Sequence, residues 1–133
     1  MKGIELLEQN PESAKLICSY YLEVMLQSLN DESLPEDFKD HVRAQAMDNR
    51  NIAAILDGNP RNLFDFFDSQ SLFINIMTEK GETFSYKIII NEIDVSSTLM
   101  AKTRKEAEKE AIITAIGMLE TRLTNSIIDK ENS

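Results

Sequence analysis

The feature that most constrains this fold is a change in the spacing of apolar residues near Leu72. From there to Leu99, apolar side chains recur at every second position in three short runs, which is typical of half-buried β-strands. The runs are separated by residues 79–82 and 91–92, which are far too short for the crossover that parallel strands require. The spacing therefore predicts a three-stranded antiparallel β-meander, with Gly81 taking a positive φ in the first turn.

Before the sheet, apolar residues recur at helical spacing, and the breaks between them carry helix-start signals. Asn10–Pro11 and Asn59–Pro60 each offer a capping side chain followed by a proline that suits the first helical position. A further helix is expected to begin near Pro35 and to bury Phe38 and Val42. The N-terminal half is thus predicted to be helical.

After the sheet, Thr103 and Glu106 form a capping box, the strongest helix-start signal in the chain. The helix that follows is expected to run to about Leu123 and to place a row of small and apolar side chains against the sheet. Residues 125–133 are mostly polar, and this tail is expected to fray.

These elements predict an α+β fold with N-terminal helices, a three-stranded antiparallel β-meander and a long C-terminal helix. No linker rich in Gly, Ser or Pro separates the helical part, residues 1–69, from the βββα part, residues 70–124. The whole chain, residues 1–133, is therefore predicted to form a single domain. Its core is expected to contain the aromatic cluster Phe64, Phe66 and Phe67.

The charge balance disfavours several classes of function. The chain has 23 acidic and 14 basic residues, a net charge of −9, and residues 1–69 hold 13 of the acids against 6 bases. Such a field repels nucleic acids and anionic membranes. The sequence also shows no apolar leader, no apolar stretch long enough to span a bilayer and no pair of cysteines. A cytoplasmic location without membrane contact is therefore expected.

Few side chains in the sequence are suited to catalysis or metal binding. Cys18 lies beside an apolar helical stripe and has no obvious base, so it is expected to be a core residue. Asp37 and His41 share a helix face, but no second His and no Cys accompanies them, and no metal site is predicted. The four glycines are scattered rather than gathered in a phosphate-binding loop. The sequence therefore predicts a protein that is not an enzyme and has no cofactor.

The two faces of the predicted sheet differ in character. One face is apolar and is expected to lie under the C-terminal helix. The other face is mostly polar but carries four apolar side chains, which are Phe73, Met77, Ile89 and Met100. These four residues are predicted to be covered by the N-terminal helices, by a protein partner or by a second copy of the chain, with a slight preference for a partner or homodimer.

Residues 73–118 run in the order strand, Gly81 turn, strand, strand and helix, and the helix begins in the basic stretch 102–108. This stretch resembles the C-terminal part of the double-stranded RNA-binding domain, in which a basic helix start contacts phosphates. The resemblance implies phosphate contacts by Arg104 and Lys105, and a nucleic-acid-binding module would use these two residues together with Lys102 and Lys109. The sequence departs from the family at Glu82, where a turn proline is expected, at Glu108, where a lysine is expected, and at Leu99 and Ala101, where glycines are expected.

The chain also looks like small proteins encoded by bacterial phages and mobile elements, through residues 103–111. The leading functional hypothesis is a non-enzymatic adaptor or regulatory protein of a bacterium or its phage, which acts through an unidentified protein partner or as a homodimer. One alternative is a nucleic-acid-binding module that uses the basic helix start. Another is an acidic mimic of nucleic acid that occupies a basic groove of its target, with the acids of the N-terminal half supplying the charge.

Overall fold

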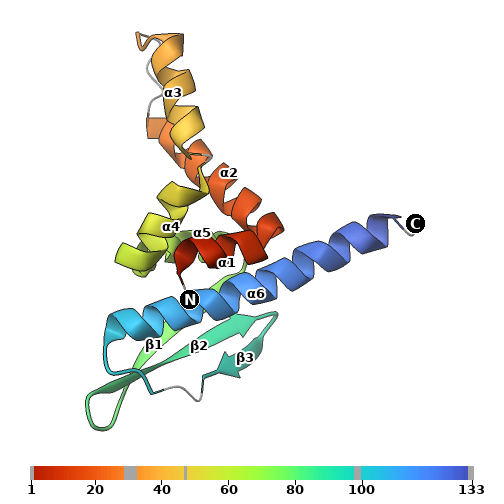
Figure 1. Cartoon of the computed structure of the whole chain (residues 1–133). Coiled ribbons are helices and arrows are strands. Elements are labelled where there is room, and N and C mark those ends of the chain that lie inside the picture. Colours follow the sequence, from red (N-terminus) through yellow and green to blue (C-terminus); the bar gives the residue numbers. More distant parts are fainter. Residues whose placement is uncertain (1, 29–32, 47, 98–99, 132–133) are drawn as a thin grey trace.

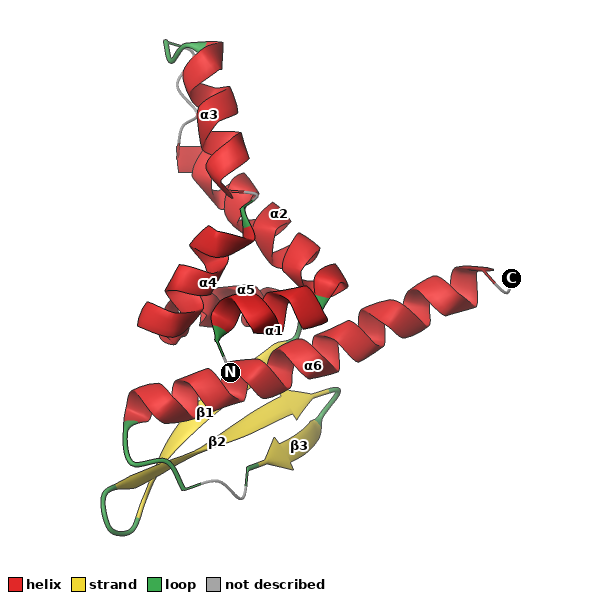
Figure 2. Ribbon diagram, viewed as in Figure 1, coloured by secondary structure: helices red, strands yellow, loops and turns green. Residues whose placement is uncertain are grey.

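The computed structural model describes residues 2–28, 33–46, 48–97 and 100–131, and the side chains of residues 28, 45 and 46 lie outside the description. The described parts form three layers (Figure 1). A β-sheet lies on one side, a long helix crosses it, and the N-terminal helices pack on the far side of that helix (Figure 2). The sheet and helices confirm the predicted α+β fold.

The order of elements follows the sequence prediction, with one additional helix at the N-terminus. The helical layer consists of α1 (Gly3–Gln9), α2 (Pro11–Ser28), α3 (Glu36–Ala46), α4 (Asn49–Gly58), a 3-10 turn η1 (Pro60–Leu63) and α5 (Phe64–Ser69). The sheet and its covering helix consist of β1 (Leu72–Glu79), β2 (Thr83–Ile90), β3 (Ile93–Ser96) and α6 (Arg104–Glu131).

The three strands form an antiparallel meander in the order β1-β2-β3, as predicted. Leu72 pairs with Ile90 and Ile88 pairs with Val95, so the alternating apolar residues of all three strands share one face. Gly81 has a φ of 78° in the first turn, and both residues of the second turn, Asn91 and Glu92, also have positive φ. Positive φ at both residues of the second turn is typical of a two-residue hairpin, whose turn matches the twist of the flanking strands. Leu99 lies outside the described residues.

Helix α6 is buried on two sides because it forms the middle layer. Thr114 bonds to Tyr86 of β2, so the side of α6 that carries Thr114 faces the sheet. The spacing of the helix places the buried Ala107 and Ala111 on that same side, where small side chains allow close approach. The hydroxyl of Ser13 in α2 donates to the carbonyl of Ile116, which marks the opposite side.

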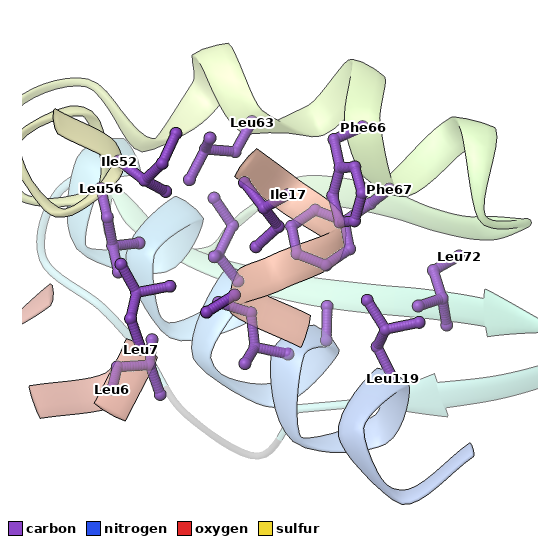
Figure 3. Packing of buried hydrophobic residues seen from close by; sticks show 14 of the residues in the cluster. Leu6, Leu7, Ile17, Ile52, Leu56, Leu63, Phe66, Phe67, Leu72 and Leu119 are labelled. Atoms are coloured by element: carbon purple, nitrogen blue, oxygen red, sulfur yellow. The ribbon is translucent and has the colours of Figure 1, made fainter. Parts of the chain in front are cut away.

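A single apolar core joins the three layers through α6. In the close view, Leu119 of α6 lies beside Leu72 of β1, while Ile17, Phe66 and Phe67 gather in the helical layer (Figure 3). Phe66 and Phe67 are fully buried in edge-to-face contact, with ring centres 5.0 Å apart. This confirms the predicted core position of these two aromatic side chains, and Phe64 packs against the core while remaining partly exposed.

The N-terminal end of α2 differs from the sequence prediction. Asn10 does not cap it, because its side-chain amide donates backwards to the Leu6 carbonyl at the end of α1, at 2.8 Å. The carboxylate of Glu120 in α6 takes its place and accepts from the backbone N–H groups of Glu12 and Ser13, at 3.1 and 2.7 Å. The cap is therefore a contact between layers rather than a local one.

Two further predictions about the helices are wrong. Phe38 is 47% exposed rather than buried, because α3 packs against the outer half of α2, which projects from the body (Figure 1), whereas Val42 is buried as expected. Helix α6 does not end near Leu123 but continues to Glu131, so the expected polar tail is largely helical.

Candidate interaction surface

The sheet presents a face that no helix of the described structure covers, here called the outer face. Phe73 of β1 pairs with Ile89 of β2, and both project away from the buried Leu72 and Ile88. Phe73 is 46% exposed, and Ile89 is partly buried. Because α6 and the N-terminal helices all lie beyond the opposite face (Figure 2), the alternative in which the N-terminal helices cover the outer face does not hold for the described structure.

The other two predicted contact residues lie in different settings. Met77 pairs with Ser85, in the same alternation as Phe73, and is partly buried. Met100 is 52% exposed and lies before the bridge between Ala101 and Phe84, where it lines a shallow pocket with Glu106 and Glu110 of α6. The structure thus brings Phe73, Met77 and Ile89 to the outer face, and places Met100 beside the start of α6.

Two pairs of polar side chains on the outer face are satisfied within the sheet. The ammonium group of Lys87 lies 2.8 Å from the carboxylate of Asp94, which connects β2 to β3. The hydroxyl of Ser85 donates to the carboxylate of Glu79 at 2.9 Å, which connects β2 to β1. A partner that covers the apolar side chains would therefore not leave these polar groups unsatisfied. This arrangement is well suited to binding an apolar surface.

The basic residues at the start of α6 differ in their surroundings. Lys109 lies 2.9 Å from the carboxylate of Asp57 in α4, and the guanidinium of Arg104 lies 5.5 Å from the ring centre of Phe84. Lys102 and Lys105 are exposed. Of the four candidate nucleic-acid contacts, the structure gathers three at the helix start and uses Lys109 to join two layers.

Asp57 is a junction that the sequence analysis missed. Its carboxylate accepts from the Gly3 backbone N–H at 3.0 Å and from the Lys109 ammonium group. The Lys109 hydrogen bond, aided by the Gly3 N–H, lowers the pKa of Asp57 below its usual range. A Cβ at Gly3 would lie 2.8 Å from the Ala53 carbonyl oxygen, so this close approach requires glycine. No local sequence pattern marks a contact between residues so far apart.

The residues considered for catalysis do not come together. The Cys18 side chain is buried in the core, and burial, with a smaller contribution from Asp48, raises the pKa of its thiol. This disfavours the thiolate that a nucleophile requires. Among the residues that the structure describes, no three His, Cys, Asp or Glu side chains gather into a potential metal site. No helix in the same residues is both long and apolar enough to cross a membrane.

A scan against protein-family models, a search of curated proteins and a search of solved structures each found no match.

Proposed function

We propose that this chain is a non-enzymatic adaptor or regulatory protein, encoded by a bacterium or its phage and located in the cytoplasm. It acts by binding another protein through the outer face of its sheet. The exposure of Phe73 on a face that lacks a covering helix is the observation that supports this function. Aromatic and methionine side chains are enriched at protein interfaces, where they supply apolar contact area. The internally paired polar groups around them lower the cost of removing this face from water.

The two alternatives each depend on charge rather than on apolar contact. Nucleic-acid binding would use Lys102, Arg104 and Lys105 at the start of α6, but these bases lie in a chain with a net charge of −9. An acidic mimic would instead use the carboxylates of the helical layer to fill a basic groove. The affinity for nucleic acid and the affinity for a basic groove both fall steeply as salt screens the charges, whereas binding through apolar contacts persists.

A capture experiment separates these functions. The wild-type chain and the variants Phe73→Asp and Phe38→Asp are immobilised and exposed to lysate of the source cell at low and high salt. Phe38 is a matched control because it is also an exposed phenylalanine but lies on α3, far from the sheet. We expect a protein that is retained at high salt by the wild type and by Phe38→Asp, and whose capture falls about tenfold or more with Phe73→Asp.

Other outcomes contradict the proposal. Capture that disappears at high salt and is unaffected by Phe73→Asp would favour the acidic mimic. Submicromolar binding of duplex RNA at about 150 mM salt would favour the nucleic-acid module. Circular dichroism of each variant establishes that a lost interaction does not reflect a lost fold.

A further inference from the structure

The two edges of the sheet differ in length and charge. Strand β3 has four residues, and one of them is Asp94. Strand β1 has eight residues, contains no proline and carries a single charge, Glu79, at its end. Charged side chains, prolines and short length are the usual protections against pairing between sheet edges. Strand β1 lacks them along most of its length, so its outward-pointing backbone N–H and C=O groups are open to another strand.

Helix α6 covers the middle of the sheet better than its edges. On the inner face, Tyr86 and Ile88 of β2 are buried, whereas Ile74 and Ile76 of β1 are only partly buried. On the outer face, Phe73 is nearly half exposed. Coverage also declines towards β3, so exposure alone does not distinguish the edges. The difference lies in the length and neutrality of β1, which make it the better template for an added strand.

We propose that β1 pairs antiparallel with β1 of a second copy of this chain, around a two-fold axis at Asn75, to form a continuous six-stranded sheet. In this register Asn75 lies opposite its own equivalent and Phe73 lies opposite Met77 of the other copy. Ile74 correspondingly lies opposite Ile76. The register keeps inner faces with inner faces and outer faces with outer faces, because paired positions have equal parity. The contacts on either side of the axis each occur twice, as a two-fold interface requires, and the contact between the two copies of Asn75 lies on the axis itself.

The positions of the charged residues favour pairing through β1 and favour a second copy of this chain as the added strand. Two copies that each carry a net charge of −9 repel, so a stable contact must avoid placing acids opposite each other. From Ser69 to Thr78 the chain contains no charged residue, and in the proposed register Glu79 lies opposite Ser71. Pairing through β3 would instead bring two copies of Asp94 into one short ladder. Strand β1 is thus complementary to itself, while a charged partner strand would find no opposite charges there.

This dimer deepens the proposed function, because it joins two outer faces into one continuous binding surface. In this dimer the second copy occupies the β1 edge of the first copy. The outer faces of both copies remain available to bind another protein. The use of the joined outer faces for binding rests on the proposed function. The dimer itself can be measured without any other protein.

The test compares Asn75→Asp with Ser96→Asp by light scattering and sedimentation at concentrations up to about 100 µM. Within one chain, Asn75 and Ser96 both lie directly opposite Lys87, from its two sides, so either new carboxylate meets the same positive charge. Between copies, only position 75 places two carboxylates opposite each other. We expect a wild-type dimer, a dimer of Ser96→Asp, and a dimer of Asn75→Asp that dissociates about fivefold or more readily.

A second pair of variants tests the register. In a Cys18→Ser background, Asn75→Cys is expected to form a disulfide between copies, because directly paired residues lie within disulfide reach. Ser96→Cys, on the far edge, is expected not to. This measurement retains its meaning if Asn75→Asp proves poorly folded.

The proposal is overturned by a wild type that stays monomeric at the highest concentration, by equal weakening in the two aspartate variants, or by cross-linking through position 96. A monomer that still captures a protein through Phe73 would reject the dimer alone. A dimer whose capture does not depend on Phe73 would reject the proposed function alone.

Discussion

The two faces of one sheet show how the same strands serve two different environments. Ile88 and Ile89 are neighbours in β2, yet Ile88 is completely buried under α6 while Ile89 lies on the outer face and is partly exposed. Tyr86 and Lys87, two neighbouring polar residues of β2, also lie on opposite faces and in different environments. Tyr86 bonds to Thr114 beneath the covering helix, and Lys87 forms an ion pair with Asp94 on the open side. The inner face is covered within the chain, whereas no helix of the described structure covers the outer face.

The covering of the inner face depends on how α6 is held. Its helical-layer side is fixed by Glu120, which caps α2, and by Lys109, which pairs with Asp57. Its sheet side packs against the apolar strands. The inner face therefore has a partner that is anchored from behind, whereas the described structure offers no corresponding element for the outer face. This difference leads us to assign stability to one face and interaction to the other.

The largest effect is expected from replacing the neighbouring isoleucines one at a time. Ile88→Ala removes fully buried side-chain volume and should lower the free energy of unfolding by about 2–5 kcal/mol. Ile89→Ala shortens a partly exposed side chain and should cost about 1 kcal/mol or less. Urea unfolding of both variants, followed by circular dichroism, measures the difference. Equal losses would mean that the outer face is core and would remove the basis for the interaction surface.

The sequence predicted the sheet well because alternation is a strict constraint. A register shift of one residue would send every apolar side chain of a strand to the opposite face, so the pattern leaves one pairing that works. The same alternation is sufficient to place Phe73, Met77 and Ile89 together on the outer face. The capping box at Thr103 was predictable for a similar reason, because the partners lie three residues apart and bond locally, with the hydroxyl of Thr103 accepting from the N–H of Glu106.

Contacts between layers were not predictable from local pattern. Glu120 caps α2 from more than a hundred residues away, and a single sequence contains no signal for this pairing. The burial of Phe38 was predicted from helical spacing, which identifies an apolar face but not what covers it. Lys109 was grouped with the alternative nucleic-acid contacts because it follows other bases in sequence, and its ion pair with Asp57 could not be predicted because the two residues meet only in the folded chain. Long-range geometry, rather than residue type, decided each of these cases.

A smaller effect is expected for the polar pair of neighbours. Tyr86→Phe removes a hydroxyl that lies 2.7 Å from the Thr114 hydroxyl beneath α6, and should cost about 0.5–1.5 kcal/mol. Lys87→Gln removes one half of a partly exposed ion pair and should cost between about 0 and 1 kcal/mol. Thermal unfolding at low and high salt separates the two variants. Only the cost of Lys87→Gln should shrink with salt, and the reverse pattern would contradict the assignment of the two faces.

The smallest effect is expected for the ion pair between Asp57 and Lys109, which holds α6 against the helical layer, and this effect depends on pH. The hydrogen bond from Lys109 lowers the pKa of Asp57 in the folded chain, so the ionised carboxylate favours folding. This contribution is fully present above the ordinary aspartate pKa of about 4, and it is lost as the pH falls further through the lower folded pKa. Because the side chain of Asp57 is 43% exposed, its loss should cost at most about 1 kcal/mol.

Asp57→Asn should therefore unfold more readily than the wild type at pH 7, and the gap should close as the solution is acidified below about pH 4. Asp68→Asn is the matched control, since Asp68 is an exposed aspartate on α5, and it should track the wild type at every pH. Urea unfolding at several pH values measures both variants. A gap that stays constant on acidification would show that Asp57 acts through its shape rather than its charge. The anchoring of α6 over the inner face would then depend on packing alone.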